Sequence, residues 1–140
     1  MVFTRDLLKA IMLTRYVRVN GDSSLVEMFV SKVGTDIDTT VERIEILLGI
    51  FPDPIMINIE LLGSKYDVQE KYLQRYRRKL SSSAYTSRSD NTIYISAKDI
   101  SRRILVHELA HAILNLYFVK NLVPIELHEI IAQHVESRIK

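Results

Sequence analysis

The chain contains no cysteine among its 140 residues. This absence excludes a disulfide framework, a thiolate nucleophile and a cysteine metal ligand, so any catalytic or metal site must be built from other side chains. No apolar stretch approaches the roughly 20 residues that a membrane-spanning helix needs. The apolar residues near the start are interrupted by charged ones, which does not fit the core of a signal peptide. The sequence therefore predicts no membrane segment and leaves the cellular compartment open.

Charge is nearly balanced, with a formal net charge of +2, and this gives little support to a nucleic-acid partner. In the most basic stretch, residues 71–79, lysines and arginines are interleaved with tyrosines and leucine at helical spacing. Such a pattern is typical of a solvated helix face, so we expect no nucleic-acid binding. The chain length, the ordinary composition and the absence of repeats or linkers predict a single domain over residues 1–140.

The segment His107-Glu108-Leu109-Ala110-His111 matches the H-E-x-x-H pattern. On a helix, residues four apart lie on one face, so both imidazoles can point to the same spot. Two imidazole nitrogens suit zinc, and Glu108 can polarise a water molecule at the same metal. Apolar residues on both sides of the motif favour a buried helix that holds the ligands rigidly. The alternative is a pair of core histidines that are satisfied by hydrogen bonds.

Zinc requires a third protein ligand, and the downstream candidates are Glu126, His128, Glu129, His134 and Glu136. A metzincin site would need glycine and histidine where this chain has Leu114 and Tyr117, which excludes that branch. Pro124 is placed to open a last helix at its first turn, and this helix would fold back toward the motif. A carboxylate in its first turns can then reach the metal. Glu129 fits best, because Ala132 one turn later lets the two helices approach closely.

Periodicity and capping signals predict helices before the motif in four segments: residues 7–13, Ser24 to Gly34, Thr39 to Gly49 and Asp67 to Leu80. Ser24 and Thr39 each have a glutamate three positions on, which is a capping-box pattern. The two glycines are typical helix ends. Asp99 or Ser101 can cap the helix that carries the H-E-x-x-H motif.

Alternating apolar residues predict strands in four segments: residues 16–19, 55–61, 84–87 and 92–96. A turn is expected at residues 20–22, and the last two strands read as a hairpin. The expected fold class is therefore α+β. A small mixed sheet with N-terminal helices precedes the motif helix and a C-terminal helix that carries the glutamate.

The run Pro124-Ile-Glu-Leu-His-Glu-Ile-Ile-Ala-Gln-His-Val-Glu136 resembles the glutamate-zincin signature, in which a Glu-Gly-Leu-Ala segment follows H-E-x-x-H. In its order of elements, residues 14–140 resemble the peptidase-MA-like metallopeptidases, and the specific motifs lie from Asn91 onward. The resemblance implies a minimal zincin-like (gluzincin) fold with zinc as the cofactor. It implies His107, His111 and Glu129 as zinc ligands and Glu108 as the general base.

Three positions near the proposed glutamate ligand depart from the family pattern. Ile130 stands where the family usually has glycine, which changes the floor of the cleft. His134 stands where the family often has tyrosine. Gln133 stands where related enzymes can place an acid that hydrogen-bonds a ligand histidine. As a neutral acceptor, Gln133 would orient the imidazole and raise its basicity less than a carboxylate would.

A metallopeptidase also needs a second electrophile beside the metal for the oxyanion of the tetrahedral intermediate. His134, Tyr94 and His128 are candidates, and each can instead be a structural residue or a partner of a ligand. Asn115, one turn beyond His111, can hydrogen-bond near the site or cap a bend.

The strand Thr92–Ser96 precedes the motif helix and is expected to form the rim of the cleft. Ile93 and Ile95 would point inward and Tyr94 outward. An extended peptide could pair with a free edge of this strand through main-chain hydrogen bonds. The alternative is a core strand that is paired on both edges.

The sequence thus predicts a zinc-dependent metallopeptidase that hydrolyses a peptide or protein substrate. One alternative is a non-catalytic or latent zinc-stabilised binding or scaffold module. In a latent form, residues 1–14 or 137–140 would lie over the zinc. Another alternative is a regulatory protease with a single protein target. Hydrolysis that depends on Glu108 separates the enzyme from the scaffold, and cleavage of generic peptides argues against a single target.

Overall fold

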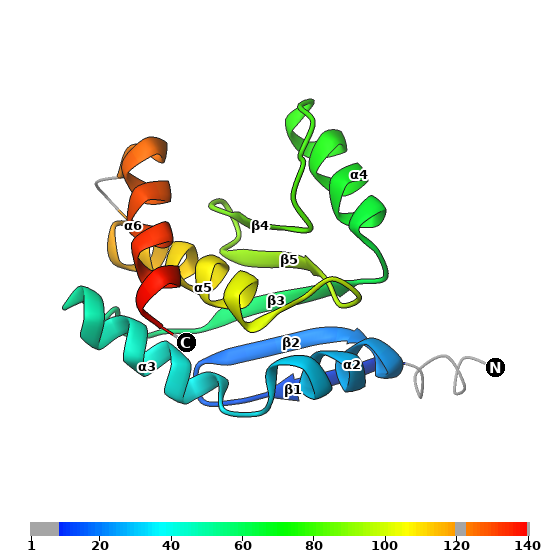
Figure 1. Ribbon diagram of the computed structural model, residues 1–140, viewed down its shortest axis with the longest axis horizontal. Helices are drawn as coiled ribbons and strands as arrows, with labels where there is room; N and C mark the ends of the chain where they lie inside the picture. Colours follow the sequence, from blue (N-terminus) through cyan, green and yellow to red (C-terminus); the bar gives the residue numbers. More distant parts are fainter. Residues whose placement is uncertain (1–8, 120–122, 140) are drawn as a thin grey trace.

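Alternating apolar residues build a five-stranded sheet at the centre of the fold. The computed structural model describes residues 9–119 and 123–139. Its strands have the order β1-β2-β3-β5-β4. They are β1 (Lys9–Leu13), β2 (Val17–Asp22), β3 (Ile57–Leu62), β4 (Ala84–Ser87) and β5 (Thr92–Ser96). The three inner strands are parallel, and the edge strands β1 and β4 run antiparallel to their neighbours (Figure 1).

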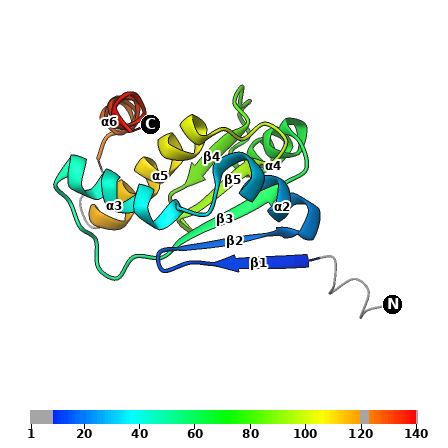
Figure 2. The same cartoon turned by 60° about the horizontal axis from the view of Figure 1, so that its bottom comes forward.

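The described residues also form five helices, which are α2 (Ser23–Val33), α3 (Ile37–Leu48), α4 (Lys65–Tyr76), α5 (Arg102–Tyr117) and α6 (Ile125–Arg138). Helices α2, α3 and α5 pack against one face of the sheet, and α4 lies on the other face over β3, β5 and β4 (Figures 1 and 2). Helix α6 packs mainly along α5. The fold is therefore α+β with a mixed sheet, as the sequence predicts.

The two faces of the sheet bury different side chains. On the α5 face, Ile59, Ile93 and Ile95 are fully buried in an aliphatic core that also contains the apolar side of α5. On the α4 face, Tyr85 and Tyr94 pack against Val68 in a smaller cluster. The predicted inward directions of Ile93 and Ile95 are thus confirmed. Tyr94 points to the opposite face, but the prediction that it points outward is wrong, because it is buried beneath α4 with an exposed fraction of 8 %.

The N-terminal prediction needs correction. Lys9–Leu13 forms strand β1 rather than a helix, and residues 7 and 8 lie outside the described residues. Residues 20–22, predicted as a turn, continue β2 to Asp22. The reason is a long-range pairing, because β1 and β2 form an antiparallel ladder from Lys9↔Asp22 to Leu13↔Arg18. Such pairing overrides the local propensities on which a sequence prediction depends.

The ends of α2 and α3 are predicted better than their starts. Gly34 and Gly49 follow α2 and α3 with φ of 81° and 69°, conformations that favour glycine. The starts lie earlier than the proposed capping boxes, because Asp22 and Asp36 occupy the N-cap positions. The helix predicted for Asp67 to Leu80 spans Lys65–Tyr76.

The segments around the motif follow the sequence prediction closely. Strands β4 and β5 form an antiparallel hairpin with the predicted bounds. Ser101 caps α5, since its side chain accepts a hydrogen bond from the Ile104 N–H. Pro124 occupies the N-cap of α6 and directs this helix back along α5. Within the described part of the chain, no helix has the length and apolar character needed to cross a membrane.

Candidate metal centre

Helix α5 places both motif histidines at the boundary between the core and a cleft. Its buried side includes Leu105, Leu109 and Ile113, each with an exposed fraction of 2 % or less. His107 and His111 lie on the side that faces α6, and both are partly buried. Because the apolar side is fixed in the core, the direction of the two imidazoles is fixed as well.

His107, His111 and Glu129 converge on one point between α5 and α6. The Nε2 atoms of the two histidines are 3.2 Å apart. The Glu129 carboxylate lies 2.7 Å from Nε2 of His107 and 3.2 Å from Nε2 of His111. Zinc bonds of about 2.0–2.2 Å in a tetrahedral arrangement separate the ligand atoms by roughly 3.3–3.6 Å, so a slight opening of this group would accommodate an ion. The three side chains could therefore hold a metal ion together.

A carboxylate holds the outer nitrogen of His107. Nδ1 of His107 lies 2.9 Å from Oε1 of Glu136, and Nε of Arg103 donates to the other Glu136 oxygen at 2.5 Å. Partial burial raises the pKa of Glu136, but hydrogen bonds from Arg103 and His107 outweigh it and keep the pKa below its usual value. An ionised Glu136 accepts the Nδ1–H of His107, which leaves Nε2 as a free lone pair for a metal.

Gln133 stands where the family pattern places the hydrogen-bond partner of a ligand histidine, but it does not make this contact. Gln133 is exposed on α6, and Glu136 has the contact instead. At 3.6 residues per turn, a residue seven positions on lies only about 20° around the helix from Glu129. Glu129 and Glu136 therefore face α5 together.

A second imidazole, not a carboxylate, holds the outer nitrogen of His111. The rings of His111 and His128 are stacked with centroids 4.8 Å apart, and their Nδ1 atoms are 2.5 Å apart. Burial, followed by the nearby His107 and Arg88, lowers the pKa of His111 to about 4. Burial, followed by His111 and Arg88, also lowers the pKa of His128 to about 4. Both rings are therefore neutral at neutral pH, which is the form in which imidazole binds a metal.

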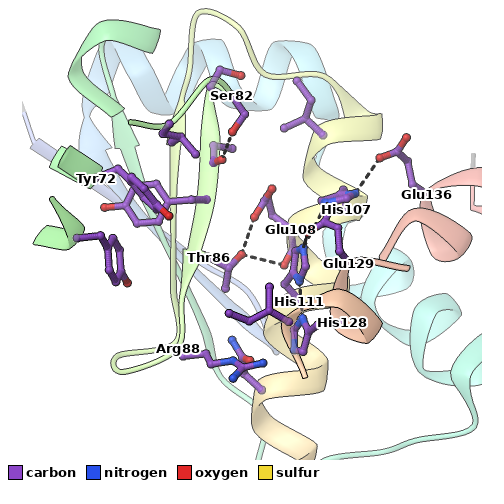
Figure 3. Close-up of a pocket in the computed structure, with 18 residues that line it drawn as sticks. Tyr72, Ser82, Thr86, Arg88, His107, Glu108, His111, His128, Glu129 and Glu136 are labelled. Atoms are coloured by element: carbon purple, nitrogen blue, oxygen red, sulfur yellow. Dashed lines mark hydrogen bonds and ion pairs between the residues drawn. The ribbon is translucent and has the colours of Figure 1, made fainter. Parts of the chain in front are cut away.

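Glu108 lies deep in the same cleft, with an exposed fraction of 8 %. The hydroxyl of Thr86 donates to its carboxylate at 2.7 Å (Figure 3). Burial raises the pKa of Glu108 to about 7, although the Thr86 hydrogen bond and His107 act in the opposite direction. A carboxyl group with a pKa near neutrality can both accept and release a proton, as a general base requires.

The cleft runs along β4 and has a volume of about 550 Å³. Residues from α5 and α6 form one wall, and Tyr72 lies on the other (Figure 3). Tyr76 and Tyr85, which contact Tyr72, also line the cleft. The expectation that a peptide pairs with a free edge of β5 is wrong, because β5 is paired with β3 and β4 on its two sides. The alternative of a core strand is confirmed. The strand with an edge in the cleft is β4.

Two residues of β4 direct their main-chain groups away from β5. The Ser96 N–H donates to the Ser83 carbonyl at 3.0 Å, which makes these residues a hydrogen-bonded pair. Hydrogen-bonded and non-hydrogen-bonded pairs alternate along an antiparallel ladder. Ala84 and Thr86 are therefore in non-hydrogen-bonded pairs, and their N–H and C=O groups point to the edge. The hydroxyl of Ser82 donates to the Ala84 carbonyl at 2.6 Å, as this orientation permits.

Of the remaining predicted site residues, two line the cleft and three do not. His128 and Asn115 line the cleft, and the buried Oδ1 of Asn115 has no hydrogen-bond partner among the described residues. Tyr94 lies on the opposite face of the sheet, where its hydroxyl donates to Asp90 at 2.9 Å. His134 and Gln133 are exposed on α6 and are not among the residues that line the cleft.

Sequence reasoning missed the roles of Thr86, Arg88 and Glu136. Arg88 follows β4, donates to the Val123 carbonyl at 2.6 Å and lines the cleft with His111 and His128. Glu136 appears in the sequence analysis only as a possible metal ligand. No spacing rule connects Thr86 or Arg88 to the motif, because the hairpin meets α5 only in the folded chain.

The described parts of the two segments proposed as a latent cover, residues 9–14 and 137–139, do not line the cleft. Residues 9–13 form β1, at the edge of the sheet opposite to β4. At the other end, Ser137 continues α6, and Ile139 is buried in the aliphatic core.

Comparison of the chain with known protein families, curated proteins and solved structures found no match. The resemblance to the peptidase-MA-like metallopeptidases therefore stays a prediction from the sequence motifs.

Proposed function

We propose that this chain is a zinc-dependent metallopeptidase of the gluzincin type. One observation supports it most strongly. Three potential ligands, His107, His111 and Glu129, converge beside the buried carboxylate of Glu108, in a cleft that runs along an edge strand. A pair of core histidines would need only hydrogen-bond partners, and it would not need a third ligand and a buried acid at the same place.

The ligand set favours zinc among the common divalent metals. Two neutral imidazoles and one carboxylate are typical of catalytic zinc sites, which leave one position open. A bound zinc ion would supply Lewis acidity, which polarises a carbonyl and lowers the pKa of water from near 16 to about 7. Glu136 and His128 orient the two ligand histidines from behind.

Glu108 transfers the protons of the reaction. Its carboxylate takes a proton from the attacking water and then passes it to the leaving amine. The Thr86 hydroxyl holds the carboxylate in place, and burial, which raises the pKa of Glu108, favours transfer of a proton to it from the water. Arg88 lies on the metal side of the cleft, where a guanidinium N–H can stabilise the oxyanion, whereas His128 contacts the outer nitrogen of His111.

The substrate in this proposal is an extended peptide that pairs with β4. The outward main-chain groups of Thr86 offer hydrogen bonds that do not depend on the substrate's side chains, whereas Ala84 is buried and its carbonyl already accepts a hydrogen bond from Ser82. Since Thr86 also contacts Glu108, a peptide in this register places its backbone next to the general base.

The proposal is tested by replacing Glu108 with glutamine in zinc-loaded protein. We expect E108Q to retain about one zinc per chain and to lose at least about 100-fold in peptide hydrolysis. Glu126→Gln is a matched control, because Glu126 is exposed on α6 and lies outside the lining of the cleft. Unchanged hydrolysis in E108Q would refute the proposed mechanism.

The same experiment separates the second candidate function, a zinc-stabilised binding module. One observation favours that candidate, since the potential ligands connect α5 with α6 and a metal would link the two helices. Bound zinc, a large loss of stability with a chelator and no hydrolysis that depends on Glu108 would support the module over the enzyme.

A further inference from the structure

Four tyrosines form a continuous aromatic cluster on the side of β4 opposite to the metal centre. The ring centroids are 4.7 Å apart for Tyr72 and Tyr76, and 5.0 Å apart for Tyr72 and Tyr85. Tyr85 stacks on Tyr94 at 5.0 Å. Tyr72, Tyr76 and Tyr85 line the cleft, and Figure 3 shows Tyr72 and Glu108 on opposite sides of the hairpin.

All four tyrosines help to pack α4 on the sheet, but two of them keep part of their surface open. Tyr85 and Tyr94 are buried and fill the space beneath α4. Tyr76, at the end of α4, retains an exposed fraction of 39 %, and Tyr72 is half-buried. An aromatic surface that is left open in a cleft favours contact with another apolar side chain.

The direction of β4 determines which substrate side chains reach this surface. Successive side chains of a strand point to opposite faces of the sheet. Within β4, Thr86 points to Glu108 and Tyr85 points to α4. A peptide that extends the sheet follows the same alternation. Its residues therefore point in turn toward the metal centre and toward Tyr76 and Tyr72.

We infer that the preferred substrates are extended peptides with an aromatic or large aliphatic side chain at a position that faces α4. This inference rests on the proposed peptidase function, and it names the substrate class of the same cleft. Tyr76 and Tyr72 determine the specificity, and Leu80 extends the apolar wall beyond the end of α4. Residues that face the metal centre contribute little to this preference.

The test uses a set of peptides that differ at a single position, with Phe, Leu, Gly or Asp placed at each position around the scissile bond. With zinc-loaded wild-type chain, we expect kcat/KM to be at least about tenfold higher for Phe or Leu than for Gly at one α4-facing position. In Y76A that ratio falls toward one. Tyr66→Ala is the matched control, because Tyr66 is an exposed tyrosine of the same helix outside the lining of the cleft.

A second variant keeps the inference testable if Y76A folds poorly. Tyr76→Lys places a long cationic side chain at the same partly exposed position. We expect the preference in Y76K to move from Phe to Asp. Equal kcat/KM for Phe, Gly and Asp in the wild type, or an unchanged Phe preference in both variants, would overturn the inference.

Binding separates this inference from the proposed function. Fluorescence anisotropy with labelled peptides and zinc-loaded E108Q requires no hydrolysis. Tighter binding of the Phe peptide than of the Gly peptide, lost in E108Q/Y76A, would support the aromatic subsite even if the wild type hydrolyses nothing. Hydrolysis without any side-chain preference would support the peptidase and refute the subsite.

Discussion

The two walls of the cleft contrast in chemistry. The wall from α5 and α6 contains the ionisable groups, which are histidines and glutamates linked by hydrogen bonds. The wall from α4 consists mainly of tyrosine rings. A single strand divides them, because Thr86 points to one wall and the neighbouring Tyr85 to the other. In the proposed peptidase, reaction and substrate selection are therefore separated across β4, so a substitution in one wall should leave the property of the other unchanged.

The largest effect is expected from Glu129→Ala. Substitution of a residue that hydrogen-bonds a metal ligand typically lowers metal affinity by roughly 10–100-fold. Loss of Glu129, a proposed ligand itself, should lower zinc affinity by more than that. Wild-type protein saturated with zinc should melt higher than chelated protein, by an amount on the order of 10 °C, and E129A should lose this difference. Metal content by mass spectrometry and thermal unfolding with and without chelator measure both effects. Full zinc content in E129A would exclude Glu129 as a ligand.

Glu136→Gln should have the next largest effect. Glutamine keeps a hydrogen-bond acceptor for His107 but removes the charge, so we expect zinc affinity to fall by about 10–100-fold. Gln133→Ala is the matched control, because Gln133 is exposed on the same helix. Competition with a chromophoric chelator gives both dissociation constants. A larger loss of zinc affinity in Q133A than in E136Q would support the prediction from the sequence that Gln133 orients a ligand histidine.

Thr86→Val tests the contact between β4 and Glu108, the proposed general base. The variant removes the hydroxyl that donates to Glu108, and we expect kcat to fall about tenfold with zinc content unchanged. Thr86→Ser keeps a hydroxyl and should restore most of the activity. The aromatic preference of the α4 wall should be the same in all three proteins. A changed preference in T86V would contradict the separation of the two walls.

Local signals in the sequence were sufficient where a short segment determines its own structure. The hairpin of β4 and β5, the Ser101 cap and the glycines after α2 and α3 all follow from neighbouring residues. The convergence of His107 with His111 follows from helical spacing, and Glu129 follows from the expected return of α6.

Contacts between distant segments were not predictable in the same way. Strand β1 exists because β2 pairs with it, and its five residues carry no strong period of their own. Whether Glu136 or Gln133 contacts His107 depends on which side of α6 faces α5. Each residue is rotated by about 100° around the helix from the one before it, so a shift of one position changes which side chain makes the contact. The contact of Thr86 with Glu108 requires the hairpin and α5 to be packed together.

The smallest effect is expected from replacing Tyr85 or Tyr94, which stack on each other on the α4 side of the sheet, with phenylalanine. Burial raises the pKa of Tyr85, so its hydroxyl stays neutral, and that buried hydroxyl has no hydrogen-bond partner within the described part of the chain. Tyr94 donates to Asp90 at 2.9 Å. Tyr85→Phe should therefore raise the free energy of unfolding by about 1 kcal/mol, and Tyr94→Phe should lower it by a similar amount.

Urea unfolding of both variants measures the difference. Opposite signs with unchanged zinc content would show that the aromatic side is independent of the metal side, and a loss of zinc in either variant would show that the two are coupled through β4.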